Sequence, residues 1–250
     1  MGNHARVANM PLLEVEDLRT YFYGDDTVVK AVDGISYNIE EGETVALVGE
    51  SGCGKSVSSL SILGLIPSPP GRIVDGEVRF RGTDLVQLPS SEMRRYRSRR
   101  IAMVFQEPMS SLNPVINIET QLTEGMITQL GLTNRQAKAR ALELLETVGI
   151  SDPERRLAQF PHEFSGGMRQ RVMIAIALSC EPELIIADEP TTSLDVTIQA
   201  QILDLMQALT RERDMALLLI THNLGVVARY VERINIMYAC LLYTSDAADE

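Results

Sequence analysis

The sequence predicts an α/β fold in which a mainly parallel β-sheet carries an N-terminal antiparallel β subdomain and an inserted α-helical subdomain. Three observations support this prediction. Short apolar runs alternate with helical patterns along much of the chain, as expected for a sheet covered by helices on both faces. Runs with the half-polar pattern of exposed strands precede the first apolar run. A helical stretch at about residues 107–164 interrupts the alternation.

The N-terminal segment predicts exposed strands followed by a buried one. Residues 13–16 and 31–39 have partly alternating polarity, which is typical of antiparallel strands with one face in solvent. Residues 43–48 are mostly apolar and predict a central strand of a parallel sheet. A glycine-rich loop follows at once, and residues 57–65 predict a helix that ends before Pro67.

The middle of the chain predicts one strand and then helices. Residues 101–105 form an apolar strand candidate. In the helical stretch that follows, Thr133 and Gln136 have the spacing of a capping box, and Gly149 ends the helix that begins there. The apolar stripe of this helix consists of Ala137, Ala141, Leu144, Leu145 and Val148.

The last third of the chain returns to alternating helices and strands. Residues 168–179 predict a helix, 184–187 a buried strand, 196–213 an amphipathic helix and 215–221 a further buried strand. The amphipathic helix has an apolar face made of Ile198, Ile202, Leu205 and Leu209.

The composition limits the classes of function. The 250 residues, 45% of them hydrophobic, suffice for one large domain. The net charge of −11 argues against nucleic-acid binding, which needs a basic surface. The three cysteines lack metal-ligand spacing, so reduced thiols are expected. No run approaches the ~18 apolar residues that a membrane span needs, and residues 1–11 lack the apolar stretch of a signal peptide.

Residues 49–56 form the first chemical motif. They read Gly-Glu-Ser-Gly-Cys-Gly-Lys-Ser, which fits the pattern G-x-x-x-x-G-K-[ST] between a strand and a helix. The glycines let successive backbone N–H groups point at one anion, and the helix start adds positive potential. Lys55 is expected to reach the β- and γ-phosphates, and Ser56 to bind Mg²⁺. A chance glycine-rich turn would not explain the strand, lysine and serine together, so the motif predicts the core of a P-loop NTPase.

Two carboxylates follow the predicted strand 184–187. Asp188 at the strand end is expected to hold Mg²⁺, and Glu189 to polarise a water molecule for in-line attack. An Asp-Glu pair in isolation would be a solvated turn. The phosphate loop upstream favours the catalytic interpretation.

A second glycine motif distinguishes between kinds of nucleotide-binding protein. Residues 164–171 read Phe-Ser-Gly-Gly-Met-Arg-Gln-Arg, and Ser165, Gly166 and Gly167 lie at a helix start, where their polar groups predict a second anion site. One chain has little use for two phosphate sites on separate loops. Two chains use both if this loop covers the nucleotide that a partner holds.

With these motifs, the sequence resembles the ATP-binding subunits of ABC transporters over about residues 12–239. Residues 49–56 match the Walker A loop, Gln106 the Q-loop, and residues 164–170 the signature, with Phe164 and Met168 in place of the commoner Leu and Gln. Asp188 and Glu189 match Walker B and the catalytic glutamate, residues 193–195 the D-loop, and residues 221–222 the H-loop.

The resemblance implies a set of functional residues. The implied cofactors are ATP and Mg²⁺. The implied catalytic residues are Glu189, His222 and Gln106, and the implied metal ligands are Ser56, Gln106 and Asp188. The residues expected to bind nucleotide are Gly49, Ser51, Gly52, Gly54, Lys55, Ser56, Val57, Ser165, Gly166, Gly167 and Asp195, with Phe22 or Tyr23 stacked on adenine.

Three of these interpretations have plain alternatives. A histidine after a strand, such as His222, is often structural, although the family uses it at the γ-phosphate. Phe22 and Tyr23 could each be core residues, and the sequence does not choose between them. The basic run 94–100 could suggest nucleic acid, but a solvated helix face is the better interpretation in so acidic a chain.

Within the family, residues 109–115, 164–175 and 191–200 resemble the ATPases of oligopeptide, dipeptide and nickel importers. This resemblance implies an ATP-hydrolysing subunit that powers import of peptides or a related small solute through ATP-driven head-to-tail dimerisation. The implied partners are a second, non-identical ATP-binding subunit, transmembrane permeases and, indirectly, an extracytoplasmic solute-binding protein. The implied location is peripheral, on the cytoplasmic face of the inner membrane.

The ends of the chain fall outside the resemblance. Residues 1–11 form an N-terminal tail. Residues 240–250 match no segment of the family, and we hypothesise that this tail is foreign to a C-terminally truncated chain, which would leave the sheet without its last strands. Two other functions are alternatives: a soluble ABC ATPase without a transport role, and a non-catalytic nucleotide-binding regulator. The retained Lys55, Asp188, Glu189 and His222 argue against the regulator.

Overall fold

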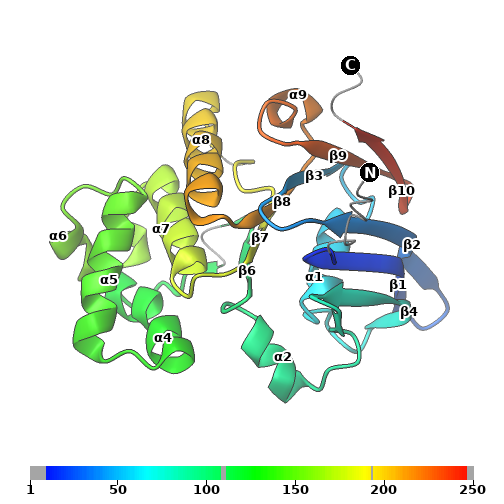
Figure 1. Cartoon of the computed structure of the whole chain (residues 1–250), viewed down its shortest axis with the longest axis horizontal. Helices are drawn as coiled ribbons and strands as arrows, with labels where there is room; N and C mark the ends of the chain where they lie inside the picture. Colours follow the sequence, from blue (N-terminus) through cyan, green and yellow to red (C-terminus); the bar gives the residue numbers. More distant parts are fainter. Residues whose placement is uncertain (1–9, 108–110, 193, 247–250) are drawn as a thin grey trace, which may run out of the picture.

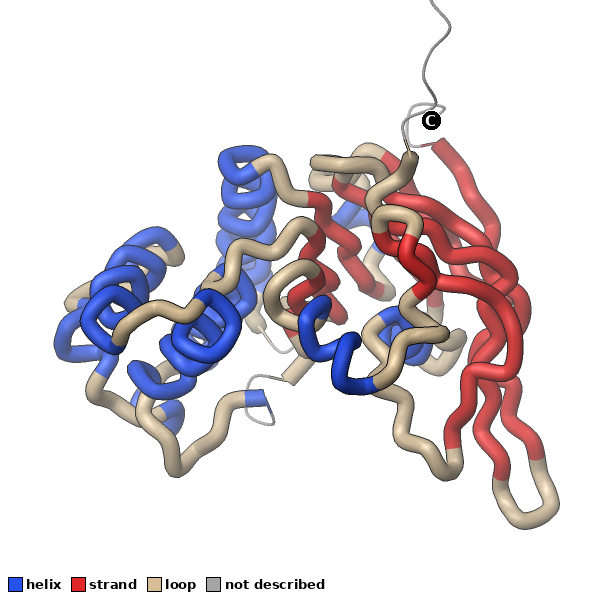
Figure 2. The backbone as a smooth tube through the Cα atoms, turned by 60° about the horizontal axis from the view of Figure 1, so that its bottom comes forward, coloured by secondary structure: helices blue, strands red, loops and turns tan. Residues whose placement is uncertain are grey.

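Two β-sheets and a group of helices make up the part of the chain that the computed structural model describes, namely residues 10–107, 111–192 and 194–246 (Figure 1). The helical group lies to one side of the larger sheet and the smaller sheet to the other, and this separation is also plain in Figure 2. The predicted α/β fold with an antiparallel subdomain and an inserted helical subdomain is confirmed.

The smaller sheet is antiparallel, as predicted, with the order β2-β1-β4-β5. Its strands are β1 (Leu13–Tyr23), β2 (Val28–Ile39), β4 (Gly71–Phe80) and β5 (Thr83–Asp84). Strand β1 extends well past the predicted residues 13–16. The register of its pairing shifts near Asp17, which has a φ of +46°. This irregularity hides the second half of the strand from a search for strict alternation.

The larger sheet has the order β10-β9-β3-β8-β7-β6. Five of its strands are parallel: β3 (Thr44–Gly49), β6 (Ile101–Val104), β7 (Leu184–Asp188), β8 (Ala216–Thr221) and β9 (Arg233–Tyr238). Val48 of β3 pairs with Thr221 of β8, and Asp188 of β7 pairs with Ile220. The carboxyl ends of the three central strands therefore meet at one edge of the sheet.

Both faces of the central strands are covered, which explains why these strands are apolar throughout. On β3, Ala46 and Val48 face the helical side, whereas Val45 and Leu47 face the smaller sheet. Strands β7 and β8 divide their side chains in the same alternating way between these two cores.

The helical subdomain begins after β6 and contains α4 (Ile118–Leu130), α5 (Asn134–Thr147) and α6 (Pro153–Leu157), followed by the 3₁₀ turn η1 (Pro161–Glu163). The predicted capping box is confirmed, because Thr133 and Gln136 bond reciprocally at the start of α5. Helices α7 (Gly166–Leu178) and α8 (Val196–Arg213) then pack beside the larger sheet.

Three short helices complete the described chain. Helix α1 (Lys55–Ile62) begins two residues earlier than predicted, because Lys55 and Ser56 already belong to its first turn. Helix α2 (Ser90–Tyr96) carries part of the basic run, and α9 (Leu224–Val227) follows β8.

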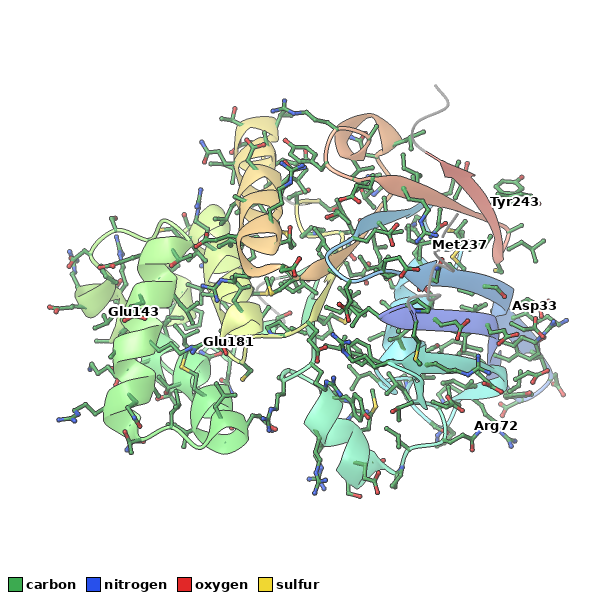
Figure 3. The ribbon with its side chains drawn as sticks, in the orientation of Figure 1. Asp33, Arg72, Glu143, Glu181, Met237 and Tyr243 are labelled. Carbon is green, nitrogen blue, oxygen red and sulfur yellow. The ribbon has the colours of Figure 1, made fainter. Side chains whose placement is uncertain are left out.

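The described part of the C-terminal tail forms strand β10 (Leu241–Asp246), which pairs antiparallel with β9. Figure 3 labels Met237 on β9 and Tyr243 on β10. We expected the sheet to lack its last strands here. Instead, β10 pairs with β9 and is the outermost strand on this side of the sheet. The foreign origin of residues 240–250 stays a hypothesis, and residues 1–9 and 247–250 lie outside the described part.

Candidate active site

The glycine-rich loop joins β3 to α1, and two of its glycines lie where no side chain fits. Gly54 has a φ of +99°, and a Cβ atom there would lie 2.1 Å from the backbone oxygen of Ala31 in β2. A Cβ atom on Gly49 would lie 2.2 Å from the backbone oxygen of Met237 in β9. The loop therefore packs directly against the backbones of β2 and β9, and only glycine allows that close approach.

Lys55 crosses the inside of the loop. Its ammonium group donates hydrogen bonds of 2.7 Å to the backbone oxygens of both Gly49 and Glu50, and the residue is 4% exposed. The side chain is thus held extended along the loop, with its charge at the place where phosphate groups are expected. Ser56 follows in the first turn of α1 and is half-buried.

A cavity of about 660 Å³ opens over this loop. A volume of this size is typical of ligand sites. The cavity lies at the carboxyl ends of parallel strands, the usual position for ligands in α/β sheets. Its lining contains nine of the predicted site residues: Ser51, Gly52, Gly54, Lys55, Ser56, Val57, Gln106, Glu189 and His222. Residues predicted from motifs far apart in the sequence therefore meet in one place.

Glu189 receives hydrogen bonds from three different loops. Its Oε2 atom accepts from Thr192 Oγ1 at 2.8 Å and from Gln106 Nε2 at 3.1 Å, and its Oε1 atom lies 3.1 Å from His222 Nδ1. Burial raises the pKa of Glu189, but the hydrogen bonds from Thr192 and His222 outweigh it and hold the pKa below the ordinary value. Glu189 is therefore an ionised acceptor, suited to polarise a water molecule.

Asp188 is a buried carboxylate beside Ser56. It is 6% exposed, and within the described residues its Oδ1 atom has no hydrogen-bond partner. Burial raises the pKa of Asp188, and Glu189 adds to that rise, whereas the hydrogen bond from Ser56 and the charge of Lys55 lower it. A buried oxygen with an unmet bond beside a serine hydroxyl fits a hard cation such as Mg²⁺, which prefers oxygen ligands.

The second glycine motif lies apart from this cavity. Ser165 caps α7 by accepting a hydrogen bond from the Met168 backbone at 3.4 Å, and Ser165 and Gly166 are exposed. A Cβ atom on Gly167 would lie 3.0 Å from the side chain of Ile198 in α8. None of the motif's residues lines the cavity of its own chain.

Other predicted residues also lie outside the cavity lining. Asp195 caps α8 by accepting a hydrogen bond of 2.9 Å from the Ile198 backbone, so the predicted D-loop ends beside the second glycine motif. Ser193 of that loop lies outside the described residues. Phe22 is half-buried and packs near Gly71, and Tyr23 is exposed. Neither aromatic residue lines the cavity, so adenine stacking on either stays a prediction.

Three lining residues were not predicted as site residues: Glu50, which lies inside the first glycine motif, Ala31 and Thr192. Ala31 in β2 reaches the cavity because β2 passes over the phosphate loop, and no local pattern indicates that crossing. Thr192 reaches it through the turn after Glu189. The signal available in the sequence for Thr192 was a hydroxyl three residues after the predicted catalytic carboxylate, Glu189.

Comparison with known proteins identifies the family. The model of the ABC transporter family matches residues 32–192. The chain belongs to the ABC transporter family. The oligopeptide transport ATP-binding protein OppD of Bacillus subtilis (strain 168) is 52% identical, over 96% of this chain and 67% of that protein. The dipeptide transport ATP-binding protein DppD of Haemophilus influenzae is 52% identical, over 92% of this chain and 69% of that protein.

Solved structures of ABC cassettes agree with this membership. MJ0796, a bacterial ABC transporter cassette solved as a dimer, superposes with a TM-score of 0.84 at 27% identity and covers 95% of this chain and 100% of that one. A second dimeric structure of MJ0796, in a post-hydrolysis state bound to ADP and Pi, has the same TM-score at 26% identity. The chain is therefore an ATP-binding, ATP-hydrolysing subunit of an ABC transporter, as its motifs predict.

None of the helices in the described residues combines the length and the apolar character that a membrane crossing requires.

Proposed function

We propose that this ABC subunit powers the import of peptides or of a related small solute. The observation that carries this proposal is the identity of about half of all residues, along nearly the whole chain, with ATP-binding proteins named for oligopeptide and dipeptide transport. Two of the sequence stretches that resemble this branch lie at functional positions: residues 164–175 contain the second glycine motif, and residues 191–200 contain Thr192, which lines the cavity. Their position supports a shared way of using ATP as well as a shared fold.

The catalytic part of the proposal rests on the cavity residues. Lys55 binds the β- and γ-phosphates, and the backbone N–H groups of the loop complete the cradle. Glu189 orients the attacking water through its ionised carboxylate. His222, whose Nδ1 atom lies 3.1 Å from Glu189 Oε1, contacts the γ-phosphate.

Mg²⁺ fits the oxygen groups at the carboxyl end of β7. Asp188 and Ser56, with Gln106 from the neighbouring loop, are the residues that would hold it. The cation, when bound, neutralises charge that develops on the phosphate oxygens. Gln106 already points at this region, because its amide lies 3.1 Å from the Glu189 carboxylate.

The second glycine motif is proposed to act on the nucleotide of a partner chain. Ser165 and Gly166 are exposed, the motif lies outside the cavity of its own chain, and Asp195 lies beside it. Two ATP-binding subunits arranged head to tail would bring Ser165, Gly166 and Gly167 of each to the phosphates of the other. The natural second subunit is proposed to be a non-identical relative.

The proposed assembly is an importer at the cytoplasmic face of the inner membrane. Transmembrane permeases bind the ATP-binding subunits there, and an extracytoplasmic solute-binding protein delivers the solute to the permeases. This chain would be the peripheral subunit that supplies free energy from ATP.

An uptake experiment tests the transport role. Cells that lack the gene for this chain but keep the other importer genes are supplied with the wild-type chain, with Lys55→Ala or with Thr147→Val. We expect labelled di- and tripeptide uptake with the wild-type chain and with Thr147→Val, whose exposed side chain lies on α5 and does not line the cavity. Lys55→Ala should abolish uptake. Equal uptake with and without the wild-type chain would refute peptide import.

A further inference from the structure

Glu189 has an unusual backbone conformation. Its φ of +45° lies in the left-handed region, which residues other than glycine rarely adopt. Such conformations persist only where the surrounding structure fixes them, and they are common at functional sites. Here the chain turns sharply after β7, and the Thr192 backbone N–H donates to the Glu189 carbonyl oxygen at 3.3 Å. The turn brings the Thr192 side chain back to the Glu189 carboxylate.

The turn is also anchored from the other side. Thr191 is 7% exposed, and its hydroxyl oxygen accepts a 2.9 Å hydrogen bond from Gln199 in the first turns of α8. Glu189 itself donates its backbone N–H to the Ile220 carbonyl oxygen of β8 at 2.9 Å. Thr192 is thus held at a fixed place between β8 and α8.

The three donors to the Glu189 carboxylate differ in the work proposed for them. Gln106 and His222 come from loops after other strands, and both are assigned contacts with the metal or the γ-phosphate. Each of them therefore has a second role besides its bond to Glu189, made with its other polar atom. Thr192 belongs to the same turn as Glu189 and is assigned no contact with the metal or the phosphates. Its 2.8 Å hydrogen bond therefore serves the Glu189 carboxylate alone.

We propose that Thr192 is a positioning residue for ATP hydrolysis. Its hydroxyl bonds Oε2 of the Glu189 carboxylate and fixes the carboxylate plane. Oε1, which lies 3.1 Å from His222 Nδ1, is then held with its second lone pair available to the attacking water. Thr192 does not contact the phosphates itself. This inference rests on the proposed role of Glu189 as the residue that orients that water.

The test compares two substitutions that differ only in the hydroxyl. Thr192→Val keeps the branched shape and removes the donor, whereas Thr192→Ser keeps the donor. Steady-state ATP hydrolysis by the full chain with Mg²⁺ gives kcat and KM, and calorimetry gives the affinity for ATP. Thr147→Val, the same change on the exposed face of α5, is the matched control, and Glu189→Gln is measured alongside.

We expect Thr192→Val to lower kcat about tenfold, in line with the loss of one hydrogen bond to a charged group. The KM for ATP and the calorimetric affinity should change less than about twofold, because the bond serves the reacting geometry and not binding. Thr192→Ser should restore most of the wild-type kcat, and Thr147→Val should leave both constants unchanged.

Two results would overturn the inference. One is a wild-type kcat for Thr192→Val. The other is an equal loss in Thr192→Val and Thr192→Ser together with a raised KM, which would indicate a packing role for the side chain. The Glu189→Gln variant tests the proposed role of Glu189 separately. Near-normal turnover in this variant would show that Glu189 does not orient the water, independently of the result for Thr192.

Discussion

Glu189 has a left-handed backbone conformation, its carboxylate is contacted by three polar side chains, and it lines the same cavity as the phosphate loop. We expect Glu189→Gln to bind ATP normally and to hydrolyse it at least ~100-fold more slowly, the loss that is typical when a residue acting on the reacting water is removed. The amide keeps the size of the side chain but loses the negative charge that polarises water. Single-turnover hydrolysis and calorimetric binding measure the two effects, and near-normal hydrolysis would contradict the assignment.

The phosphate loop offers a comparison between two glycines with similar backbones. Gly54 and Gly52 have φ values of +99° and +82°. A Cβ atom on Gly54 would lie 2.1 Å from a backbone oxygen, whereas a Cβ atom on Gly52 would meet no atom of another residue beyond its chain neighbours within 4 Å. We expect Gly54→Ala to lower ATP affinity at least ~10-fold, because the loop must move to relieve the clash. Gly52→Ala should lose clearly less affinity. Calorimetry measures both, and equal losses would show that backbone strain alone decides.

Among single residues, the sequence predicted the positions of those that lie in short local motifs. Lys55, Ser56, Asp188 and Glu189 lie in short motifs with a fixed position relative to a strand, so their meeting follows from the topology of a parallel sheet. Ala31 was not predictable, because it reaches the cavity only through the path of another subdomain.

At the scale of elements, strongly periodic segments were predicted well and irregular ones were missed. The helix predicted at residues 196–213 coincides with α8, because its apolar face repeats for several turns. Strand β4 was missed because Asp75 and Gly76 interrupt it and look like a turn. Its pairing with β1, a contact distant in sequence, holds it extended, and no local pattern reports such a contact.

Helix α5 allows its capping box to be tested for stability. The Thr133 hydroxyl accepts from the Gln136 backbone at 3.4 Å, and Gln136 accepts in return from the Thr133 backbone at 3.0 Å. We expect Thr133→Ala to lower the free energy of unfolding by ~1 kcal/mol. Thr147→Ala, whose hydroxyl bonds only within the same helix, should not destabilise the chain. Urea midpoints measure the difference, and equal midpoints for the two variants would contradict a stabilising cap.

The whole chain contains two motifs that are predicted to bind phosphate, and its own fold keeps them apart. Lys55 lies in the cavity at the sheet edge, whereas Ser165 and Gly167 are at the start of α7, outside that cavity. Ile198 of α8 packs at Gly167, and Gln199 of the same helix holds the turn that contains Thr192. Helix α8 therefore connects the surface proposed to meet a partner with Glu189, the proposed catalytic carboxylate.

This separation predicts complementation between two inactive variants. In a head-to-tail pair, Lys55→Ala in one chain and Gly167→Asp in the other fall on the same composite site, and the second site keeps a normal Lys55 and a normal Gly167. Each variant alone should hydrolyse almost no ATP, because every pair then carries a lesion at both sites. In Gly167→Asp the lesion is a carboxylate placed against phosphate.

Mixing the two purified variants should therefore restore ATP hydrolysis that neither shows by itself, and the restored rate should depend on their ratio, with a maximum near equal amounts. ATP should also promote association of the mixture, because binding across the interface favours the paired state. A mixture as inactive as its components, under conditions in which the wild-type chain pairs and hydrolyses ATP, would mean that each loop serves the nucleotide of its own chain.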